Sequence, residues 1–313
     1  MPLFQLSKVG LAKVGQSKFS LEAELHKLIE DNLGVVFNCR LVAREFPTGA
    51  QHAGRIDTLA LSEDGNPVII EYKVVESSDL INQSLFYLSW IHDHRGDFEM
   101  AAHKRLGPDI TVDWSAVRVI CIAPNYRKYD LHAVKMVGAK LELWTYRRFD
   151  NDTMFIEEVL KRTEDVAGPA TNSAGKNPIM VAAGKKAAET KKLGIQYSKE
   201  SHFSKGGAKL APVAMAAHDY VCGLDLAIEA VPKKQYIAYK TTENIVCMDV
   251  NATRVALFLK LDPKEHGGPV GLSRDVSKIG HFGTGDLEIV LKSLDDLEKT
   301  KPFIQQAYQA VGG

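Results

Sequence analysis

The fold is decided by residues 54–73, which read GRIDTLALSEDGNPVIIEYK. Residues 54–61 and 68–73 are short apolar runs of the length and composition typical of strands buried in a sheet. A polar turn with an Asp-Gly pair at Asp64 separates them, and this pair between extended apolar runs is typical of a β-hairpin. The sequence therefore predicts two adjacent antiparallel strands.

Three ionisable residues interrupt these strands: Asp57, Glu71 and Lys73. An ionised group taken out of water without partners costs several kcal/mol, so such groups are expected to pair or to hold a metal. If the hairpin is centred on Asp64, position 57 faces position 71, because their sum is twice 64. Strand side chains alternate, so Glu71 and Lys73 share one face. All three side chains can therefore converge.

The chemistry of this cluster points to a metal. Two adjacent carboxylates repel each other unless one is protonated or a cation lies between them. Oxygen ligands suit Mg²⁺ or Mn²⁺, and such an ion beside an ammonium group would assist water attack on a phosphodiester. The alternative is a buried ion pair of Lys73 with Glu71 or Asp57.

Asp57, a spacer of 13 residues and then Glu71-Tyr72-Lys73 resemble the core motif of the PD-(D/E)XK nuclease superfamily, in its NucS-type and RecB-like endonuclease branch. The resemblance implies an α/β fold with a restriction-endonuclease-like core, a mixed central sheet flanked by helices. It also implies that Asp57, Glu71 and the backbone carbonyl of Tyr72 bind the metal, and that Lys73 orients or activates the attacking water. Ile56 departs from the proline in the superfamily's name.

Residues 78–94 are predicted to form a helix on which Gln83 and Tyr87, four positions apart, share one face. They resemble the glutamine and tyrosine motif that follows the lysine strand in RecB-like members. The resemblance implies that Gln83 borders the metal site and that Tyr87 contacts DNA. The alternative for Tyr87 is core packing.

An earlier helix is predicted over residues 20–33, with Ser20 as its N-cap. Its apolar stripe is centred nearer to Glu22 than to Glu24 or Glu30. Because many family members place a glutamate of this helix in the site, Glu22 is the catalytic candidate and Glu24 the reserve. A solvated helix face is the alternative.

Phosphate contacts are predicted around the loop that leads into the acidic strand, from Arg44, His52 and Arg55, with plain solvent exposure as the alternative. Gly54 would permit close backbone approach. The remaining elements are predicted as strands 35–46, 115–123, 141–149, 235–241, 245–250, 254–261 and 287–291, and helices 130–137, 214–230 and 294–310.

Length and composition predict a globular protein of two domains, with 313 residues, 45% hydrophobic and 25% charged. Residues 161–211 hold 10 Lys and Arg against 4 Asp and Glu. We therefore expect a nuclease-like domain at 1–162, a flexible basic linker at 163–194, and a small α+β domain at 195–313.

The expected location is the cytoplasm, without a membrane partner. No apolar run approaches the length of a membrane span, and the N-terminus lacks the pattern of a secretory signal. The four cysteines are scattered singly, which favours reduced thiols rather than a zinc site; they are Cys39, Cys121, Cys222 and Cys247.

The C-terminal part resembles a small uncharacterised domain described as a predicted transport protein, through Tyr236–Thr242 and Ile279–Asp286. A transport role is hard to reconcile with the lack of a membrane segment. The glycine-rich stretch lacks the lysine and helix of a P-loop, so a tight turn before a strand is favoured over a phosphate site. His281 and Asp286 are the candidate residues there.

These features predict a metal-dependent endonuclease that hydrolyses DNA phosphodiester bonds in repair, restriction or defence. The cofactor would be Mg²⁺ or Mn²⁺ and the partner DNA, and cleavage of both strands would suggest a homodimer. The alternative is a catalytically inactive nucleic-acid-binding protein that retains the nuclease fold.

Overall fold

A computed structural model describes residues 2–8, 10–49, 54–76, 79–137, 141–159 and 197–312. The chain divides into two units, Met1–Lys191 and Lys192–Gly313. The predicted basic linker, residues 163–194, lies in the sequence between the described parts of these units. That linker and the predicted phosphate contact His52 lie outside the described residues.

The first unit is built on a mixed β-sheet. Among its described residues the strand order is β3-β8-β7-β6-β5-β4, with β9 beside β8. The β6–β7 and β7–β8 pairs are parallel and the others antiparallel. The strands are β3 Gln16–Ser17, β4 Cys39–Pro47, β5 Arg55–Ser62, β6 Pro67–Tyr72, β7 Arg118–Ala123, β8 Leu141–Phe149 and β9 Met154–Glu158.

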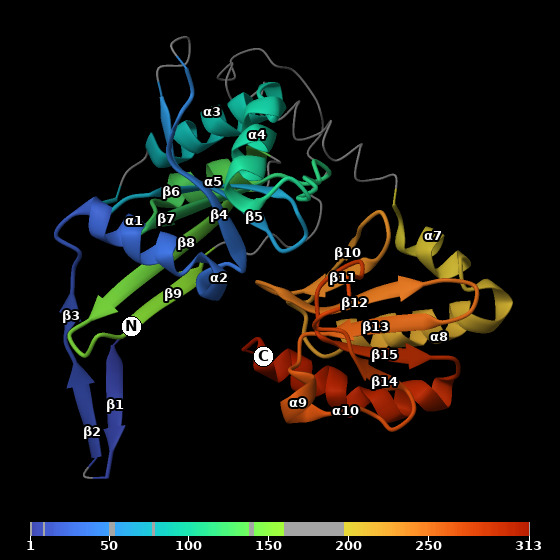
Figure 1. Cartoon of the computed structure of the whole chain (residues 1–313). Coiled ribbons are helices and arrows are strands. Elements are labelled where there is room, and N and C mark those ends of the chain that lie inside the picture. The colour runs from blue at the N-terminus through green and yellow to red at the C-terminus, as the bar shows by residue number, and fades with distance from the viewer. Residues whose placement is uncertain are drawn as a thin grey trace. The chain divides into compact units, whose positions relative to one another are not determined.

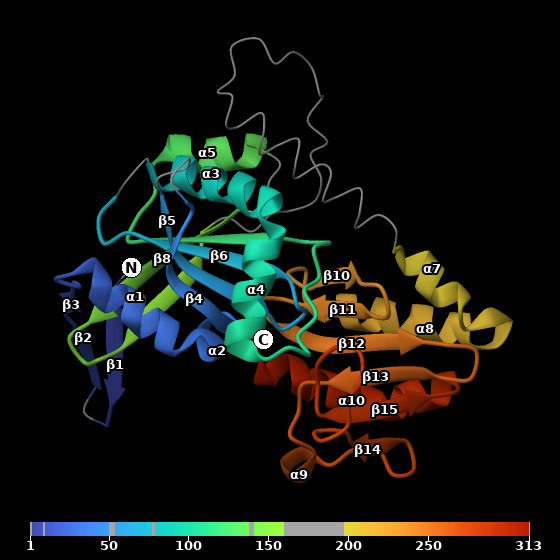
Figure 2. The same cartoon turned by 45° about the horizontal axis from the view of Figure 1, so that its top comes forward.

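Helices cover both faces of this sheet (Figure 1, Figure 2). They are α1 Glu22–Asp31, α2 Leu33–Val36, α3 Asp79–Asp93, α4 Arg95–Leu106 and α5 Lys128–Val137. The first two pack on one face, and the other three pack on the opposite face. The predicted α/β architecture, a mixed central sheet flanked by helices, is confirmed.

Strand β6 is buried on both faces, as expected for a central strand between two helical layers. Val68, Ile70 and Tyr72 join the core under α1, whereas Ile69 joins the core under α3. Each aliphatic side chain contributes about 1.5–3 kcal/mol of burial free energy. By the same alternation Glu71 faces the α3 side, where a charged residue conflicts with its apolar surroundings.

Helix α1 is held by the buried side chains of Leu25 and Ile29. The predicted N-cap is wrong: Leu21 takes the cap position, and its side chain forms no capping hydrogen bond. Ser20 lies one residue before it and donates its backbone N–H and its hydroxyl to the Glu24 carboxylate. The serine therefore binds the first helical turn from outside the helix.

Two stretches near the N-terminus differ from the prediction. The strand expected from residue 35 begins at Cys39, because Leu33–Val36 form the short helix α2. A separate hairpin, β1 Leu3–Ser7 with β2 Gly10–Val14, was not predicted. Its side chains are largely exposed, so it lacks the alternating buried pattern that identifies a strand in sequence.

The second unit contains an antiparallel sheet with helices packed on one face (Figure 1). In its described part the strand order is β10-β11-β12-β13-β15-β14. The strands are β10 Glu229–Pro232, β11 Ile237–Lys240, β12 Asn244–Val250, β13 Val255–Leu259, β14 Ser273–Asp275 and β15 Leu287–Leu291. The helices are α7 Lys199–Ser204, α8 Gly207–Cys222, α9 Pro263–His266 and α10 Leu294–Ala310.

The helix predicted at 214–230 is wrong in its limits. Helix α8 begins at Gly207 and ends at Cys222, with Gly223 as its C-cap, and residues 229–232 form strand β10. The apolar stripe of α8 starts at Leu210, before the predicted beginning. Within the described parts of the chain, no helix is both long and apolar enough to cross a bilayer.

Leu25→Ala is expected to lower the free energy of unfolding of the first unit by about 2–5 kcal/mol, because Leu25 is fully buried. Leu28→Ala is the matched control on the same helix; Leu28 is 42% exposed, and the expected loss is below about 1 kcal/mol. Trp90, Trp114 and Trp144 all lie in the first unit, so urea unfolding followed by tryptophan fluorescence reports on this unit. Equal losses in both variants would contradict the packing of α1.

Candidate active site

The predicted register of the β5–β6 hairpin is confirmed. Thr58 pairs with Ile70, which centres the hairpin on residue 64 and places Asp57 opposite Glu71. From Asp57 towards the start of β5, hydrogen bonds to side-chain carboxyl groups replace the backbone-to-backbone hydrogen bonds between the two strands. The Asp57 N–H donates to Glu71 Oε1 at 3.0 Å, and the Tyr72 N–H donates to Asp57 Oδ2 at 3.1 Å. Two carboxyl groups are therefore fixed where the strands separate.

Burial controls the protonation of both acids. Glu71 is fully buried, and the Asp57 side chain is 15% exposed. Burial raises the pKa of Glu71 well above its ordinary value, and the charge of Asp57 raises it further. Burial also raises the pKa of Asp57, although the hydrogen bond from the Tyr72 N–H opposes this shift. Without a counter-charge, the pair therefore favours protonation.

The donor set at the end of the hairpin fits a hard divalent cation. Glu71 Oε2 is buried and has no hydrogen-bond partner among the residues that the structure describes. A buried oxygen of this kind needs a partner, and a cation would supply one while favouring the charged carboxylates. Asp57 and Glu71 could hold the ion through carboxylate oxygens and Tyr72 through its backbone carbonyl, and such oxygens suit Mg²⁺ or Mn²⁺.

Lys73 and Glu22 meet beside these acids. Lys73 Nζ lies 3.0 Å from Glu22 Oε1, and the Val74 N–H donates to Glu22 Oε2 at 3.3 Å. Burial alone would lower the pKa of Lys73, but the hydrogen bond and charge of Glu22 outweigh it, so the pKa lies above its ordinary value. Lys73 is therefore a charged donor rather than a base. Glu24, the reserve candidate, is exposed and bound by Ser20.

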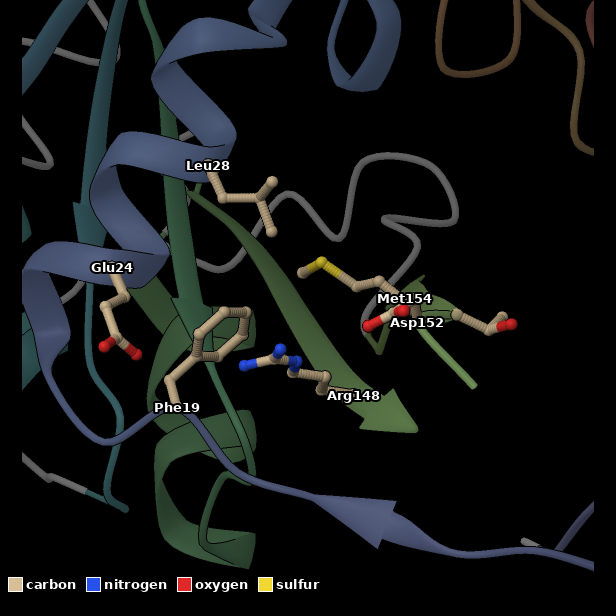
Figure 3. A pocket seen from close by; sticks show the side chains of 7 residues that line it. Phe19, Glu24, Leu28, Arg148, Asp152 and Met154 are labelled. Carbon is tan, nitrogen blue, oxygen red and sulfur yellow. The ribbon is translucent and has the colours of Figure 1, made fainter. Parts of the chain in front are cut away.

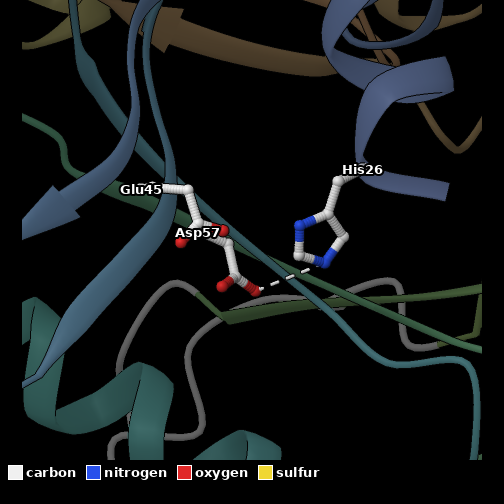
Figure 4. Close-up of side chains that lie close together, drawn as sticks. All are labelled: His26, Glu45 and Asp57. Atoms are coloured by element: carbon white, nitrogen blue, oxygen red, sulfur yellow. Dashed lines mark ion pairs between the residues drawn. The ribbon is translucent and has the colours of Figure 1, made fainter. Parts of the chain in front are cut away.

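His26 is a site residue that the sequence prediction missed. It lies one helical turn after Glu22, and its Nε2 is 3.8 Å from Asp57 Oδ2 (Figure 4) and 3.9 Å from Glu22 Oε1. Its ring lies against Tyr72, with the ring centres 4.3 Å apart. The spacing of four residues from Glu22 was the available signal, because it places both side chains on one helix face.

Gln83 and Tyr87 lie on α3 and support the backbone of β5. The Tyr87 hydroxyl accepts a hydrogen bond from the Arg55 N–H at 3.1 Å and donates to the Arg55 carbonyl at 2.8 Å. Gln83 Nε2 donates to the same hydroxyl at 3.1 Å. Tyr87 is 3% exposed, so its placement favours the core-packing alternative. A Cβ at Gly54 would lie only 3.0 Å from the Tyr87 ring, which explains the glycine.

The three residues predicted to contact phosphate differ in where they lie. Arg44 binds Glu30 and Asp31 of α1, at 2.6 and 2.7 Å, and is not part of the carboxyl cluster. Arg55 is 67% exposed and pairs with Glu45 of β4. His52 lies outside the described residues.

A pocket of about 430 Å³ lies elsewhere on the first unit (Figure 3). It is bordered by Glu24 and Leu28, which lie on a different face of α1 from Glu22 and His26. The Arg148 guanidinium lies over the Phe19 ring, 5.3 Å from its centre, and both residues line this pocket.

The glycine-rich stretch of the second unit packs against its sheet. Gly283 and Gly285 have φ of 86° and 123°, and a Cβ at either would clash with Cys247 or with the backbone of β13. His281 stacks on Phe258, with the ring centres 4.2 Å apart. This packing supports the tight-turn interpretation. Asp286 accepts a backbone hydrogen bond from Val276 through its carbonyl.

Residues 199–311, within the second unit, match a family described as a domain of unknown function, DUF5655. An uncharacterized protein of Haemophilus influenzae is 28% identical over 311 residues, which cover 98% of this chain and 99% of that protein. The similarity to the Haemophilus influenzae protein therefore extends over both units.

Two solved structures align with 41% of this chain. A repair endonuclease from Pyrococcus abyssi is 21% identical with a TM-score of 0.26, over 48% of its own chain. The protein in an EndoMS-dsDNA2 complex is 22% identical with a TM-score of 0.29, over 46% of its chain. The alignments thus span less than half of either solved chain.

Proposed function

We infer that the first unit is a metal-dependent endonuclease that hydrolyses phosphodiester bonds in DNA. One observation carries this inference. Two carboxyl groups, Asp57 and Glu71, are fixed by each other's strands, and a fully buried Glu71 oxygen has no hydrogen-bond partner in the described part of the chain. A charged lysine, Lys73, directly follows the last residue of β6. Such a set of groups can support cation-assisted phosphodiester hydrolysis.

Asp57, Glu71 and the Tyr72 carbonyl are assigned to bind Mg²⁺ or Mn²⁺. When bound, the ion would supply positive charge to the phosphate oxygens and make the attacking water more acidic. The chain's own contribution is rigidity, because each acid accepts a backbone N–H from the opposite strand. The acids therefore need little reorganisation when substrate binds.

Lys73 is assigned to orient the attacking water or a phosphate oxygen by donating hydrogen bonds. Its raised pKa keeps the ammonium charged, which suits a donor. Glu22 positions Lys73 through the 3.0 Å contact with its Nζ. Gln83 has an indirect role: it donates a hydrogen bond to the Tyr87 hydroxyl, which in turn binds the backbone of Arg55.

DNA is the proposed partner, and Arg55 is the exposed cation nearest in sequence to Asp57. Its guanidinium would attract the phosphate backbone without reading sequence. Repair, restriction or defence is the proposed setting, in the cytoplasm, and cutting of both strands would require two sites, as in a homodimer.

A second candidate function is a catalytically inactive nucleic-acid-binding protein. It is favoured by the placement of Lys73, whose ammonium is engaged by Glu22. In that case the lysine and glutamate would form a structural ion pair, and the two buried acids would remain protonated.

Asp57→Asn and Lys73→Met are each expected to reduce DNA cleavage by at least about 100-fold, because one removes a metal ligand and the other a charged donor. The matched control is Glu157→Gln, which changes an exposed acid of β9. Cleavage of single-stranded, duplex, branched and mismatched DNA is measured with Mg²⁺, with Mn²⁺ and with EDTA. Binding without cleavage on every substrate would support the inactive module instead.

Glu71→Gln is expected to stabilise the metal-free first unit at neutral pH, because it removes a fully buried carboxyl group. In the wild type the folded-state pKa of Glu71 is raised. As the pH rises, the unfolded chain therefore loses the Glu71 proton at a lower pH than the folded chain does. Stability should therefore fall as the pH rises from about 4.3, the ordinary value, towards the folded pKa. The variant should show a weaker fall.

This dependence is measured by urea unfolding with tryptophan fluorescence over a pH series in EDTA. The control is Glu157→Gln, which changes an exposed acid of β9. Added Mn²⁺ is expected to stabilise the wild type more than Glu71→Gln. A variant less stable than the wild type at every pH would contradict the cost assigned to the buried acid.

A further inference from the structure

The second unit carries a charge cluster on the sheet face away from α8 and α10. Glu288 lies directly opposite Phe258 in the β13–β15 pair and opposite Arg274 in the β14–β15 pair. Phe258 belongs to the small core of this face, whereas α8 and α10 pack on the other face. Glu288 is fully buried, and it pairs with Arg274 Nε and, at 2.9 Å, with Arg254 Nη1. One carboxylate therefore fixes two guanidinium groups.

Stability alone is a weak explanation for this cluster. The desolvation of a buried carboxylate can exceed what its ion pairs return, and apolar side chains in such positions are often at least as stable. What Glu288 does supply is a fixed position for two cations that still reach solvent. The Arg254 and Arg274 side chains are 33% and 55% exposed. The cluster is therefore suited to hold an anion at the surface.

Arg274 is the cation best placed for such a ligand. It faces Glu288 through Nε, and its two Nη groups have no other partner among the residues that the structure describes. These N–H groups form the fork with which arginine binds a phosphate through two hydrogen bonds. Arg254 is less available, because its charge also acts on Asp249, the other acid of this sheet face.

Flat rings lie beside these arginines. The His281 ring stacks on Phe258 with parallel planes and ring centres 4.2 Å apart. Phe258 is two strands away from Arg274, which corresponds to about 10 Å. Phe258 covers one face of the imidazole, and His281 is only half-buried, so the other face is available for stacking. Phe282, the next residue, is 58% exposed. Nucleobases stack on side chains of both kinds.

We propose that this sheet face of the second unit binds single-stranded nucleic acid. Arg274, supported by Arg254, contacts the phosphates, and His281 and Phe282 each stack on a base. A single strand fits because its bases can turn onto the rings, whereas the bases of a duplex are covered by their neighbours. Phosphate contacts and stacking carry little sequence information, so the binding is expected to tolerate any sequence. This role goes beyond the cleavage proposed for the first unit and does not depend on it.

The test measures binding to the full-length protein without a purification tag. Fluorescence anisotropy is recorded with labelled thymidine and uridine strands of about 20 nucleotides, which exceeds the usual site size of one small binding domain. EDTA is present, so that metal-dependent cleavage cannot interfere. The wild type is expected to bind at least one of these strands more tightly than it binds a duplex. The thymidine and uridine strands separate DNA from RNA as the source of the ligand.

Variants separate the phosphate contact from the stacking contact. Arg274→Gln is expected to weaken binding and to reduce the slope of log affinity against log salt by about 0.7, the share of one phosphate. His281→Ala is expected to weaken binding at least about 5-fold without changing that slope, because it removes a stacked base. Lys299→Gln is the matched control, since it removes an exposed charge from α10. It should keep the wild-type affinity and slope.

Arg274→Gln also leaves Glu288 with one partner fewer, so its folding is checked by circular dichroism. Arg274→Lys retains a positive charge beside Glu288 and is the conservative variant. It should keep the salt slope but bind more weakly than the wild type, because an ammonium group lacks the planar fork.

A measurement on the wild type does not depend on the folding of any variant. A single strand that carries iodouracil is irradiated in the complex, and the crosslinked peptides are identified by mass spectrometry. Crosslinks are expected at His281 or Phe282, the residues assigned to stack on bases. Crosslinks confined to the first unit would overturn the proposal.

Other outcomes also decide it. Unchanged affinity and salt slope in both Arg274→Gln and His281→Ala would overturn the proposal and leave the Glu288 cluster as a structural ion pair. Equal competition by polyglutamate would also overturn it, because the arginines would then fit an acidic protein. The nuclease inference is tested separately by cleavage with metal. Single-strand binding through Arg274 and His281 without cleavage of any DNA substrate would support this surface and reject the nuclease.

Discussion

The structure of the site depends on the exchange of hydrogen bonds where β5 and β6 part. Each strand supplies an acid that accepts a backbone N–H from the other strand, Asp57 from Tyr72 and Glu71 from Asp57. The same two bonds close the end of the hairpin and fix the carboxyl groups. Neither acid can turn away without leaving a backbone N–H unpaired, which is costly in a buried position. The hydrogen bonds that hold these two strands together are therefore also the ones that position the site.

The hairpin could be predicted because local chemistry specifies it. The Asp64-Gly65 pair defines the centre of the turn, and strand alternation then fixes which residues face each other. Glu22 could also be located, because its place at the edge of an apolar helix stripe follows from the 3.6-residue period. These features depend on short-range patterns only, and such patterns are visible in a single sequence.

The partners of long polar side chains could not be predicted in the same way. Arg44 binds two acids of α1, Glu30 and Asp31, and this contact depends on how the helix lies over the sheet. His26 shares a helix face with Glu22, but that spacing alone does not distinguish it from a histidine buried for packing. The left-handed backbone of Glu45 within a strand also has no local sequence signature, since glycine would be the residue expected there.

Helix α3 also has a consequence for strand alignment. The Tyr87 hydroxyl forms hydrogen bonds with both the N–H and the carbonyl of Arg55, and so occupies the place of a neighbouring strand. A shift of β5 by one position would send Asp57 to the opposite side of the sheet. It would also break the two hydrogen bonds between Tyr87 and Arg55. The two hydrogen bonds of Tyr87 therefore stabilise the register that keeps Asp57 on its own side of the sheet.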